Sequence, residues 1–157
     1  MLKDIFIDNN IAKNFSNPLD PEYKKLIRWL MQCDAVHPAA NAYLVVSNKL
    51  IAEYQRTARN ATLATSIPMI ISQLTKEGRL IKISNQAIKD FQHAYFSKSV
   101  VKKLTCNYED REHLPVVLLS QRKYALSLDD KFIADLEHFP GFVVLVKKRP
   151  EELPYAQ

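Results

Sequence analysis

Four acidic residues stand where an α/β fold would place side chains for chemistry. Asp8 directly follows the apolar run Ile5-Phe6-Ile7, and Asp129 follows another expected strand near the end of the chain. Glu53 lies in the second turn of a helix that leaves a strand, and Asp110 begins a later helix. In open parallel sheets, functional side chains gather at the carboxyl ends of the strands. We therefore expect these four carboxylates to converge on one edge of a sheet.

Clustered carboxylates of this kind can hold a divalent cation. Mg²⁺ and Mn²⁺ prefer oxygen ligands, so the four acids predict a site for one of these ions. Asp8 and Asp110 also have ordinary structural interpretations, because the first could start a turn and the second could cap a helix. Glu53 is harder to explain in this way. It lies within the inward-facing segment 50–54, and a carboxylate beside apolar side chains needs a partner or a metal.

The elements that must position these acids follow from the apolar periodicity. The expected strands cover residues 5–7, 42–46, 80–83, 124–127 and 142–146. The expected helices cover residues 20–31, a segment beginning after Ser47, and residues 62–76, 86–96, 98–104, 110–120 and 130–137. Asp20 and Ser47 are the expected N-caps of their helices. The helix over 62–76 is expected to bend or to start at Pro68 and to end at Gly78.

Strands separated by helices predict an α/β fold with three layers. A central, mostly parallel five-stranded sheet would be covered by helices on both of its faces. The length of 157 residues suits one domain. We expect this domain to span residues 1–146 and to be followed by a peripheral C-terminal tail over 147–157.

Composition excludes several kinds of site and compartment. The chain has two glycines, too few for a Walker loop or a G-x-G-x-x-G fingerprint, in which backbone amides approach phosphates closely. No uncharged run is long enough for a membrane span, and the acid at position 4 makes a secretory signal unexpected. Cys33 and Cys106 form no C-x-x-C pair. This favours two reduced core thiols and a cytoplasmic location.

Four short motifs around the acids resemble those of one enzyme family. They are Phe6-Ile7-Asp8-Asn9-Asn10, the segment 46–54 that ends in Ala52-Glu53-Tyr54, Asp110-Arg111-Glu112-His113-Leu114, and Leu126-Ser127-Leu128-Asp129. In order and spacing they are similar to the motifs of PIN-domain nucleases, including VapC-like proteins, over nearly the whole chain. The resemblance implies a PIN-like fold. Bacterial toxins of the family usually have small residues after the third acid, where this chain has Arg111-Glu112-His113.

The resemblance also implies an activity, which is the metal-dependent cleavage of RNA. The family's catalytic ligands of Mg²⁺ or Mn²⁺ correspond here to Asp8, Glu53, Asp110 and Asp129. Ser127 and Asn10 match positions that support these ligands through hydrogen bonds. The adjacent Asp130 leaves the fourth ligand ambiguous by one position. We prefer Asp129, because it fits the Thr/Ser-x-Asp pattern and leaves Asp130 to cap the next helix.

Basic residues suggest how a nucleic acid would be held. The net charge of +5 suits an anionic partner such as RNA, whose affinity for proteins comes largely from phosphate contacts. Arg56 and Arg59 follow Glu53 by one and two helical turns, so they are the expected phosphate contacts. His113 lies three residues after Asp110 on the same expected helix face, and a packing or surface role is the default for it.

Two functional classes remain open at this point. The first is a Mg²⁺- or Mn²⁺-dependent endoribonuclease, such as the toxin of a toxin–antitoxin pair. Its partners would be RNA, an antitoxin protein and a second copy of the chain, and no membrane would be involved. The second is a PIN-like protein that binds nucleic acid without turnover. A haloacid-type phosphatase is disfavoured, because that class needs Asp-x-Asp after the first strand and this chain has Asp8-Asn9-Asn10.

Overall fold

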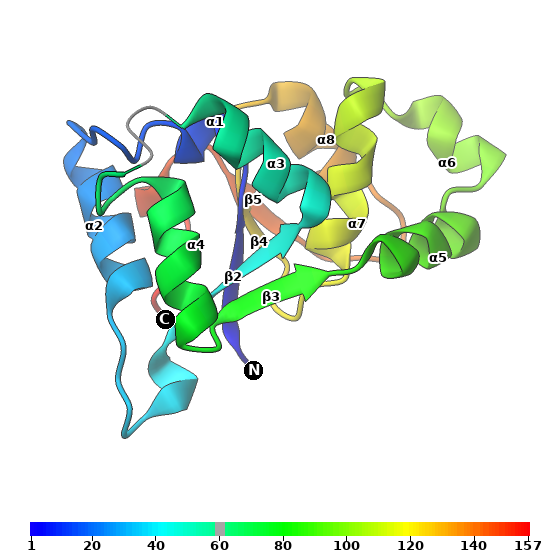
Figure 1. Ribbon diagram of the computed structural model, residues 1–157. Helices are drawn as coiled ribbons and strands as arrows, with labels where there is room; N and C mark the ends of the chain where they lie inside the picture. Colours follow the sequence, from blue (N-terminus) through cyan, green and yellow to red (C-terminus); the bar gives the residue numbers. More distant parts are fainter. Residues whose placement is uncertain (59–61) are drawn as a thin grey trace.

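Five parallel strands form one sheet in the computed structural model, which describes residues 1–58 and 62–157 (Figure 1). The strands are β1 (Lys3–Ile7), β2 (Ala42–Ser47), β3 (Leu80–Ile83), β4 (Tyr124–Leu126) and β5 (Leu145–Lys147). Their order across the sheet is β3-β2-β1-β4-β5. The strands β2 and β3 therefore lie on one side of β1, and β4 and β5 lie on the other. Such a reversal in strand order opens a crevice at the carboxyl ends of the strands.

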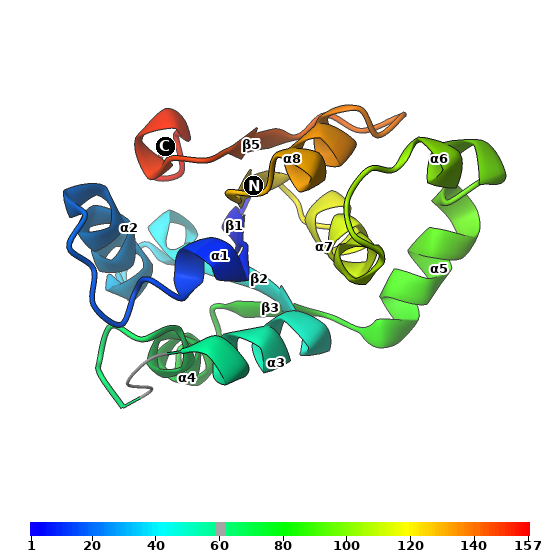
Figure 2. The ribbon, with the colours of Figure 1, turned by 90° about the horizontal axis from the view of Figure 1, so that it is seen from above.

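Helices cover both faces of the sheet. They are α1 (Asn9–Ala12), α2 (Pro21–Met31), α3 (Asn48–Thr57), α4 (Ile67–Lys76), α5 (Asn85–Tyr95), α6 (Lys98–Lys103), α7 (His113–Leu118) and α8 (Asp130–Glu137). The short 3₁₀ segments are η1 (Pro38–Ala40), η2 (Tyr108–Glu112) and η3 (Pro150–Glu152). Seen from above, α2 and α4 lie on one side of the sheet and α7 and α8 on the other, with α5 and α6 outside α7 (Figure 2). No described helix has the length and hydropathy that a membrane span requires.

The two central strands form the middle of the hydrophobic core. Ile5, Phe6 and Ile7 of β1 are fully shielded from solvent, as are residues 44–46 of β2. Strands with helices on both faces bury side chains in both directions, which explains these continuous apolar runs. Each such side chain contributes on the order of 1.5–3 kcal/mol through burial. The core therefore fixes the strand ends that carry the predicted acids.

The observed architecture confirms the expected fold class, with helices on both faces of a five-stranded parallel sheet. Two helix starts are also as predicted. The Asp20 side chain accepts a hydrogen bond from the Glu22 N–H, and the Ser47 side chain accepts one from the Leu50 N–H. Gly78 follows α4 with φ +70°, a backbone conformation in which glycine is not strained.

The bounds of two helices differ from the full predicted ranges, and proline explains both differences. The helix expected over 62–76, with a bend or a start at Pro68, begins at Ile67, so that Pro68 lies in its first turn. The segment expected to be one helix over 110–120 is divided into η2 and α7, and Pro115 lies in the first turn of α7. A proline in the first turn costs no helical hydrogen bond, whereas one farther inside removes a bond and clashes with the preceding turn.

The last strand is shorter at its start than predicted. We expected it over 142–146, whereas pairing with β4 begins at Leu145. Phe142 instead joins a group of aromatic rings, with its centroid 5.4 Å from that of Phe91 in α5. Aromatic contacts, which the apolar pattern alone does not distinguish from strand pairing, thus hold this part of the chain.

The segment after β5 packs against α2. Tyr155 is buried, and its ring lies 4.8 Å from that of Trp29. Arg149 forms an ion pair of 2.7 Å with Asp20, the N-cap of α2. These contacts attach the end of the chain to α2, which lies close to the C-terminal segment in Figure 1.

The two cysteines differ in their surroundings. Both thiols are free; Cys106 is buried, as predicted, and Cys33 is exposed. The prediction of a core thiol was therefore wrong for Cys33. It follows the end of α2 by two residues, where the apolar face of that helix no longer directs side chains toward the sheet.

Candidate functional site

The carboxyl ends of neighbouring strands bring the predicted acids to one edge of the sheet. Ile7 pairs with Leu126, and the Asp8 N–H donates to the Leu126 carbonyl at 2.9 Å. Asp8 therefore lies at the end of β1, next to the loop that leads from β4 to Asp129. Because β2 is the other neighbour of β1, helix α3 leaves the same edge and carries Glu53.

A network of hydrogen bonds fixes the side chain of Asp8. Ser127 Oγ donates to Asp8 Oδ2 at 2.7 Å, and the Asn9 N–H donates to Asp8 Oδ1 at 2.8 Å. Asn10 Nδ2 lies 3.3 Å from Asp8 Oδ2, while Asn10 Oδ1 accepts from the Leu128 N–H at 3.1 Å. The predicted supporting residues Ser127 and Asn10 thus both contact Asp8 and join it to the loop after β4.

The two adjacent acids after β4 have different partners. Asp129 Oδ1 accepts from the N–H groups of Lys131 and Phe132 at 2.9 and 3.2 Å, so Asp129 is the N-cap of α8. Asp130 is exposed and forms an ion pair with Lys148 at 2.5 Å. We had expected Asp130 to provide the cap, which was wrong by one position. Asp129 is the residue with extended backbone just before the helix, as an N-cap must be.

Glu53 is paired with a buried histidine of α7. His113 Nε2 lies 3.0 Å from Glu53 Oε1 and 2.9 Å from Oε2. The side chains of His113 and Glu53 are 1% and 17% exposed, and the imidazole packs 5.9 Å from the ring of Phe6. In the described part of the chain, His113 Nδ1 has no hydrogen-bond partner. The contact between His113 and Glu53 was not predicted; the one sequence signal that placed His113 near the acids is its position three residues after Asp110.

Asp110 contributes to the same region through its charge. Burial within η2 raises its pKa, and the nearby charges of Asp8, Asp129 and Glu53 raise the pKa further, while the charge of His113 opposes them. Like charges disfavour joint ionisation of neighbouring carboxyl groups. The other three predicted acids therefore all lie close enough to Asp110 to influence its ionisation.

Asp8 experiences the same kind of surroundings. Burial raises the pKa of its carboxyl group above the usual value. The hydrogen bond from Ser127 opposes that change most strongly, followed by the charge of His113 and the bond from the Asn9 N–H, whereas the charge of Glu53 adds to it. Asp8 is thus a desolvated acid that its neighbours hold in one orientation.

Comparison with known proteins gives a match in structure and none in sequence. No family model matches the chain, and no curated protein matches it. Among solved structures, the chain is similar to one of VapBC2 from Rickettsia felis bound to a DNA fragment from their promoter. The match has a TM-score of 0.54 and covers 93% of this chain and 98% of that chain, at 14% sequence identity. The fold is PIN-like. The chemistry must be argued from the residues of this chain.

The four acids at the carboxyl edge of the sheet have the chemical type of side chain that binds divalent cations. All four are carboxylates, the hard oxygen donors that Mg²⁺ and Mn²⁺ prefer. Burial is the main cause that raises the pKa of Asp8 and Asp110, and a cation would relieve the charge repulsion that adds to it. Within residues 1–58 and 62–157, however, no three His, Cys, Asp or Glu side chains are grouped so that they could hold a metal ion. Glu53 is bonded through both oxygens to His113. The chain therefore has carboxylate side chains of the kind that bind Mg²⁺, but in the described residues they are not arranged as a complete metal site.

The expected phosphate contacts can be placed only in part. Arg56 is exposed in the last turn of α3, three residues beyond Glu53. Arg59 lies outside the described residues. Near the end of the same helix, Thr57 Oγ1 donates to Asn9 Oδ1 at 2.8 Å. This bond attaches the end of α3 to the turn that follows Asp8.

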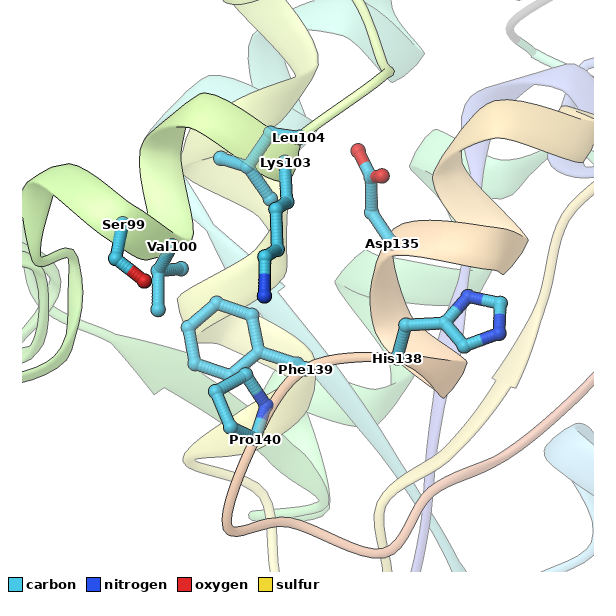
Figure 3. A pocket seen from close by; sticks show the side chains of 8 residues that line it. All are labelled: Ser99, Val100, Lys103, Leu104, Asp135, His138, Phe139 and Pro140. Carbon is cyan, nitrogen blue, oxygen red and sulfur yellow. The ribbon is translucent and has the colours of Figure 1, made fainter.

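A separate cavity of about 260 Å³ lies between α6 and α8 (Figure 3). Its walls are mainly apolar and include Leu104 and Phe139. The carboxylate of Asp135 beside it accepts hydrogen bonds from the Thr105 and Cys106 N–H groups at 2.9 and 2.8 Å, so it holds the loop after α6. Of the predicted site residues that the structure describes, none lines this cavity.

Proposed function

We propose that this protein is a Mg²⁺- or Mn²⁺-dependent endoribonuclease that hydrolyses phosphodiester bonds in RNA. The observation that carries the proposal is the convergence of acids from distant segments at one edge of the sheet, where Ser127 Oγ donates to Asp8 Oδ2 at 2.7 Å and accepts from the Asp129 N–H at 3.1 Å. Beside the effect of burial, the charges of Asp8, Asp129 and Glu53 also raise the pKa of Asp110. Carboxyl groups with shifted pKa values concentrate at functional sites. The likeness in fold to VapBC2 from Rickettsia felis supports the same proposal.

The chain's own residues would hold the ion and keep the site in shape. The ligands, directly or through water, would be Asp8, Glu53, Asp110 and Asp129. A bound ion of this kind supplies a nucleophilic water and stabilises negative charge on the scissile phosphate. Ser127 holds the Asp8 carboxylate through its Oγ. A ligand fixed beforehand in this way needs little rearrangement during the reaction.

The pair of Glu53 and His113 positions two of these acids relative to each other. It joins α3 to α7, and Asp110 lies three residues before His113. His113 thereby sets the distance between the helix that carries Glu53 and the segment that carries Asp110. Its charge also favours the ionised form of Asp110, which is the form that binds a cation.

The proposal extends to partners. RNA would be the substrate in the cytoplasm, and a toxin role would add an antitoxin protein that inhibits cleavage. The structural likeness to VapBC2 supports such a pairing. A homodimer is proposed as well, and light scattering on the purified chain checks it. The dimer requires twice the 18.1 kDa mass of one chain.

A second candidate function is the binding of nucleic acid without cleavage. The observation that favours it is the engagement of both Glu53 oxygens by His113. A carboxylate whose two oxygens are both bonded to an imidazole has less capacity for a cation. Under this alternative, RNA binds equally well in chelator and in Mn²⁺, and no products form.

Incubation with end-labelled RNAs tests the proposed activity. Structured and single-stranded RNAs are mixed with the wild-type protein in Mn²⁺ or in chelator, and the products are separated on a denaturing gel. We expect cleavage in Mn²⁺ only, leaving a 5′-phosphate and a 3′-hydroxyl, as water attack produces. Asp8→Asn keeps the size of the side chain and removes its charge, so it should abolish cleavage. Asp130→Asn is the matched control and should cleave normally.

Two results would contradict the proposal. One is cleavage that continues undiminished in chelator, since the acids would then have no cation to hold. The other is full activity of Asp8→Asn prepared free of contaminating nuclease. RNA binding without cleavage by the wild type in Mn²⁺ would favour the second candidate.

A further inference from the structure

A polar groove lies beside the carboxylate edge, between α3 and α5. It has a volume of about 420 Å³, which is within the usual range for ligand sites. Its lining residues, which we call the α3–α5 groove, are Asn48, Lys49, Asn85, Ile88, Lys89, Gln92 and Glu112. They come from the first turn of α3, the inner side of α5 and the end of η2. The groove is distinct from the cavity of Figure 3.

The groove adjoins the acids through the elements that form its walls. Lys49 lies one helical turn before Glu53 on α3, and Lys49 Nζ donates to the Glu109 carbonyl of η2. Glu109 directly precedes Asp110, and Glu112 of the groove follows it by two residues. Two of the proposed metal ligands are therefore carried by walls of this groove.

The side chains of the groove have unused capacity for hydrogen bonds. In the described part of the chain, the side-chain amides of Asn48, Asn85 and Gln92 have no partner, and neither has the ammonium group of Lys89. Lys49 uses one of its three donors on Glu109. The groove thus presents two cations and three amides to a ligand from outside the chain.

This set of groups matches a nucleotide in an unpaired strand. Lysine ammonium groups bind backbone phosphates, while Asn and Gln amides present a donor and an acceptor that match base edges. A carboxylate such as that of Glu112 accepts from a base amino group, and the exposed edge of Ile88, which lines the groove, offers an apolar contact. Base edges of this kind are accessible in single strands and are largely hidden in an RNA duplex.

We infer that the α3–α5 groove binds a nucleotide of a single-stranded polynucleotide next to the bond that is cut. Its phosphates lie on Lys49 and Lys89, and its base lies against Asn85 and Gln92. The inference rests on the proposed nuclease function for the position of the cut. The groove itself is tested without cleavage.

Fluorescence anisotropy in chelator measures the binding. The probe is a labelled twelve-nucleotide single-stranded RNA, titrated with the full chain at several salt concentrations. Lys49→Gln with Lys89→Gln should weaken binding about tenfold and reduce the dependence of log affinity on log salt by about 1.4, because each phosphate contact on a single strand contributes about 0.7. Asn85→Ala with Gln92→Ala should also weaken binding and leave the salt dependence unchanged, because amides carry no charge.

A matched control comes from the opposite side of the molecule. Lys24 and Lys25 are exposed on α2, which lies far from α5 (Figure 2). Changing both to Gln removes the same charge and should alter the affinity by less than about twofold. Equal weakening by the two lysine pairs would overturn the inference, because binding would then follow net charge alone.

Other probes identify the form of the ligand. A duplex of the same sequence should bind at least about tenfold more weakly, and equal affinity for the duplex would overturn the role of the base edges. The DNA version of the strand shows whether the groove distinguishes the sugar, and its binding at the same lysines supports a polynucleotide site. If RNA binding depends on the groove and no cleavage occurs, the proposed nuclease function is wrong and the groove is still a binding site. If cleavage occurs and the groove variants do not change it, the nuclease function stands and the inference about the groove is wrong.

Discussion

The carboxylate of Glu53 and the imidazole of His113 are bonded through both carboxylate oxygens, at 2.9 and 3.0 Å, although the residues are 60 positions apart in sequence. The pair joins α3 to α7 directly behind the acidic edge of the sheet. Since the imidazole is 1% exposed and the carboxylate 17%, water can replace neither partner completely. A change at either residue therefore affects both the stability of the fold and the placement of Asp110.

Removing the imidazole should destabilise the protein. His113→Leu leaves the Glu53 carboxylate without its partner in a partly buried position, and we expect a loss of about 2–3 kcal/mol in the free energy of unfolding. Glu53→Gln should cost less, because a neutral amide can still bond His113. Urea unfolding of both single variants and of the double variant measures the coupling. Costs that simply add would show that the two side chains do not stabilise each other.

Stability in chelator should depend on pH through Asp8 and Asp110. The pKa of each is raised in the folded protein, so the folded state holds a proton that the unfolded chain releases. Their contribution is present below the ordinary pKa of about 3.8 and is lost as pH rises through the raised values. Asp20 and Glu77 have lowered pKa values and act in the opposite direction.

A comparison of variants isolates this contribution. Asp8→Asn and Asp110→Asn should each melt at a higher temperature than the wild type at pH 7 in chelator, and the difference should shrink as pH falls toward 4. Thermal melts across this range provide the measurement. A difference that does not change with pH would mean that the two carboxyl groups titrate normally in the folded protein.

The adjacent acids of the fourth motif should separate activity from stability. Asp129→Asn retains a side chain that caps helices well, so we expect a change in stability below about 0.5 kcal/mol together with loss of cleavage. Asp130→Asn removes an exposed ion pair with Lys148, which is worth at most about 1 kcal/mol, and should leave cleavage intact. If Asp130→Asn proves to be the inactive variant, the fourth ligand has been assigned one position too early.

The sequence predicted those features that depend on local patterns. Buried strands appear as short apolar runs, and parallel strands end at one edge, so the neighbouring positions of Asp8 and Asp129 followed from their places after two such runs. The cap at Ser47 was predictable for the same reason, since it depends on a bond to the third residue of its own helix.

Features set by contacts between distant segments could not be predicted in this way. The pairing of His113 with Glu53 depends on how α7 packs against α3, and the start of the last strand depends on aromatic rings that surround Phe142. The cap of α8 was misplaced because Asp129 and Asp130 are identical in type, and only the backbone conformation distinguishes them.

Four thermal melts at neutral pH test the central claim that the carboxylates share one cation. Wild type and Asp8→Asn are each melted in chelator and in Mn²⁺ at about a hundredfold excess over its dissociation constant. Binding to the folded state alone should stabilise the wild type by about 2.7 kcal/mol, or roughly 5–10 °C for a chain of this size. Asp8→Asn should begin from a higher melting temperature in chelator and gain less than about half of that shift. Equal Mn²⁺-induced shifts in the two proteins would contradict the account, because Asp8 would then have no part in binding the ion.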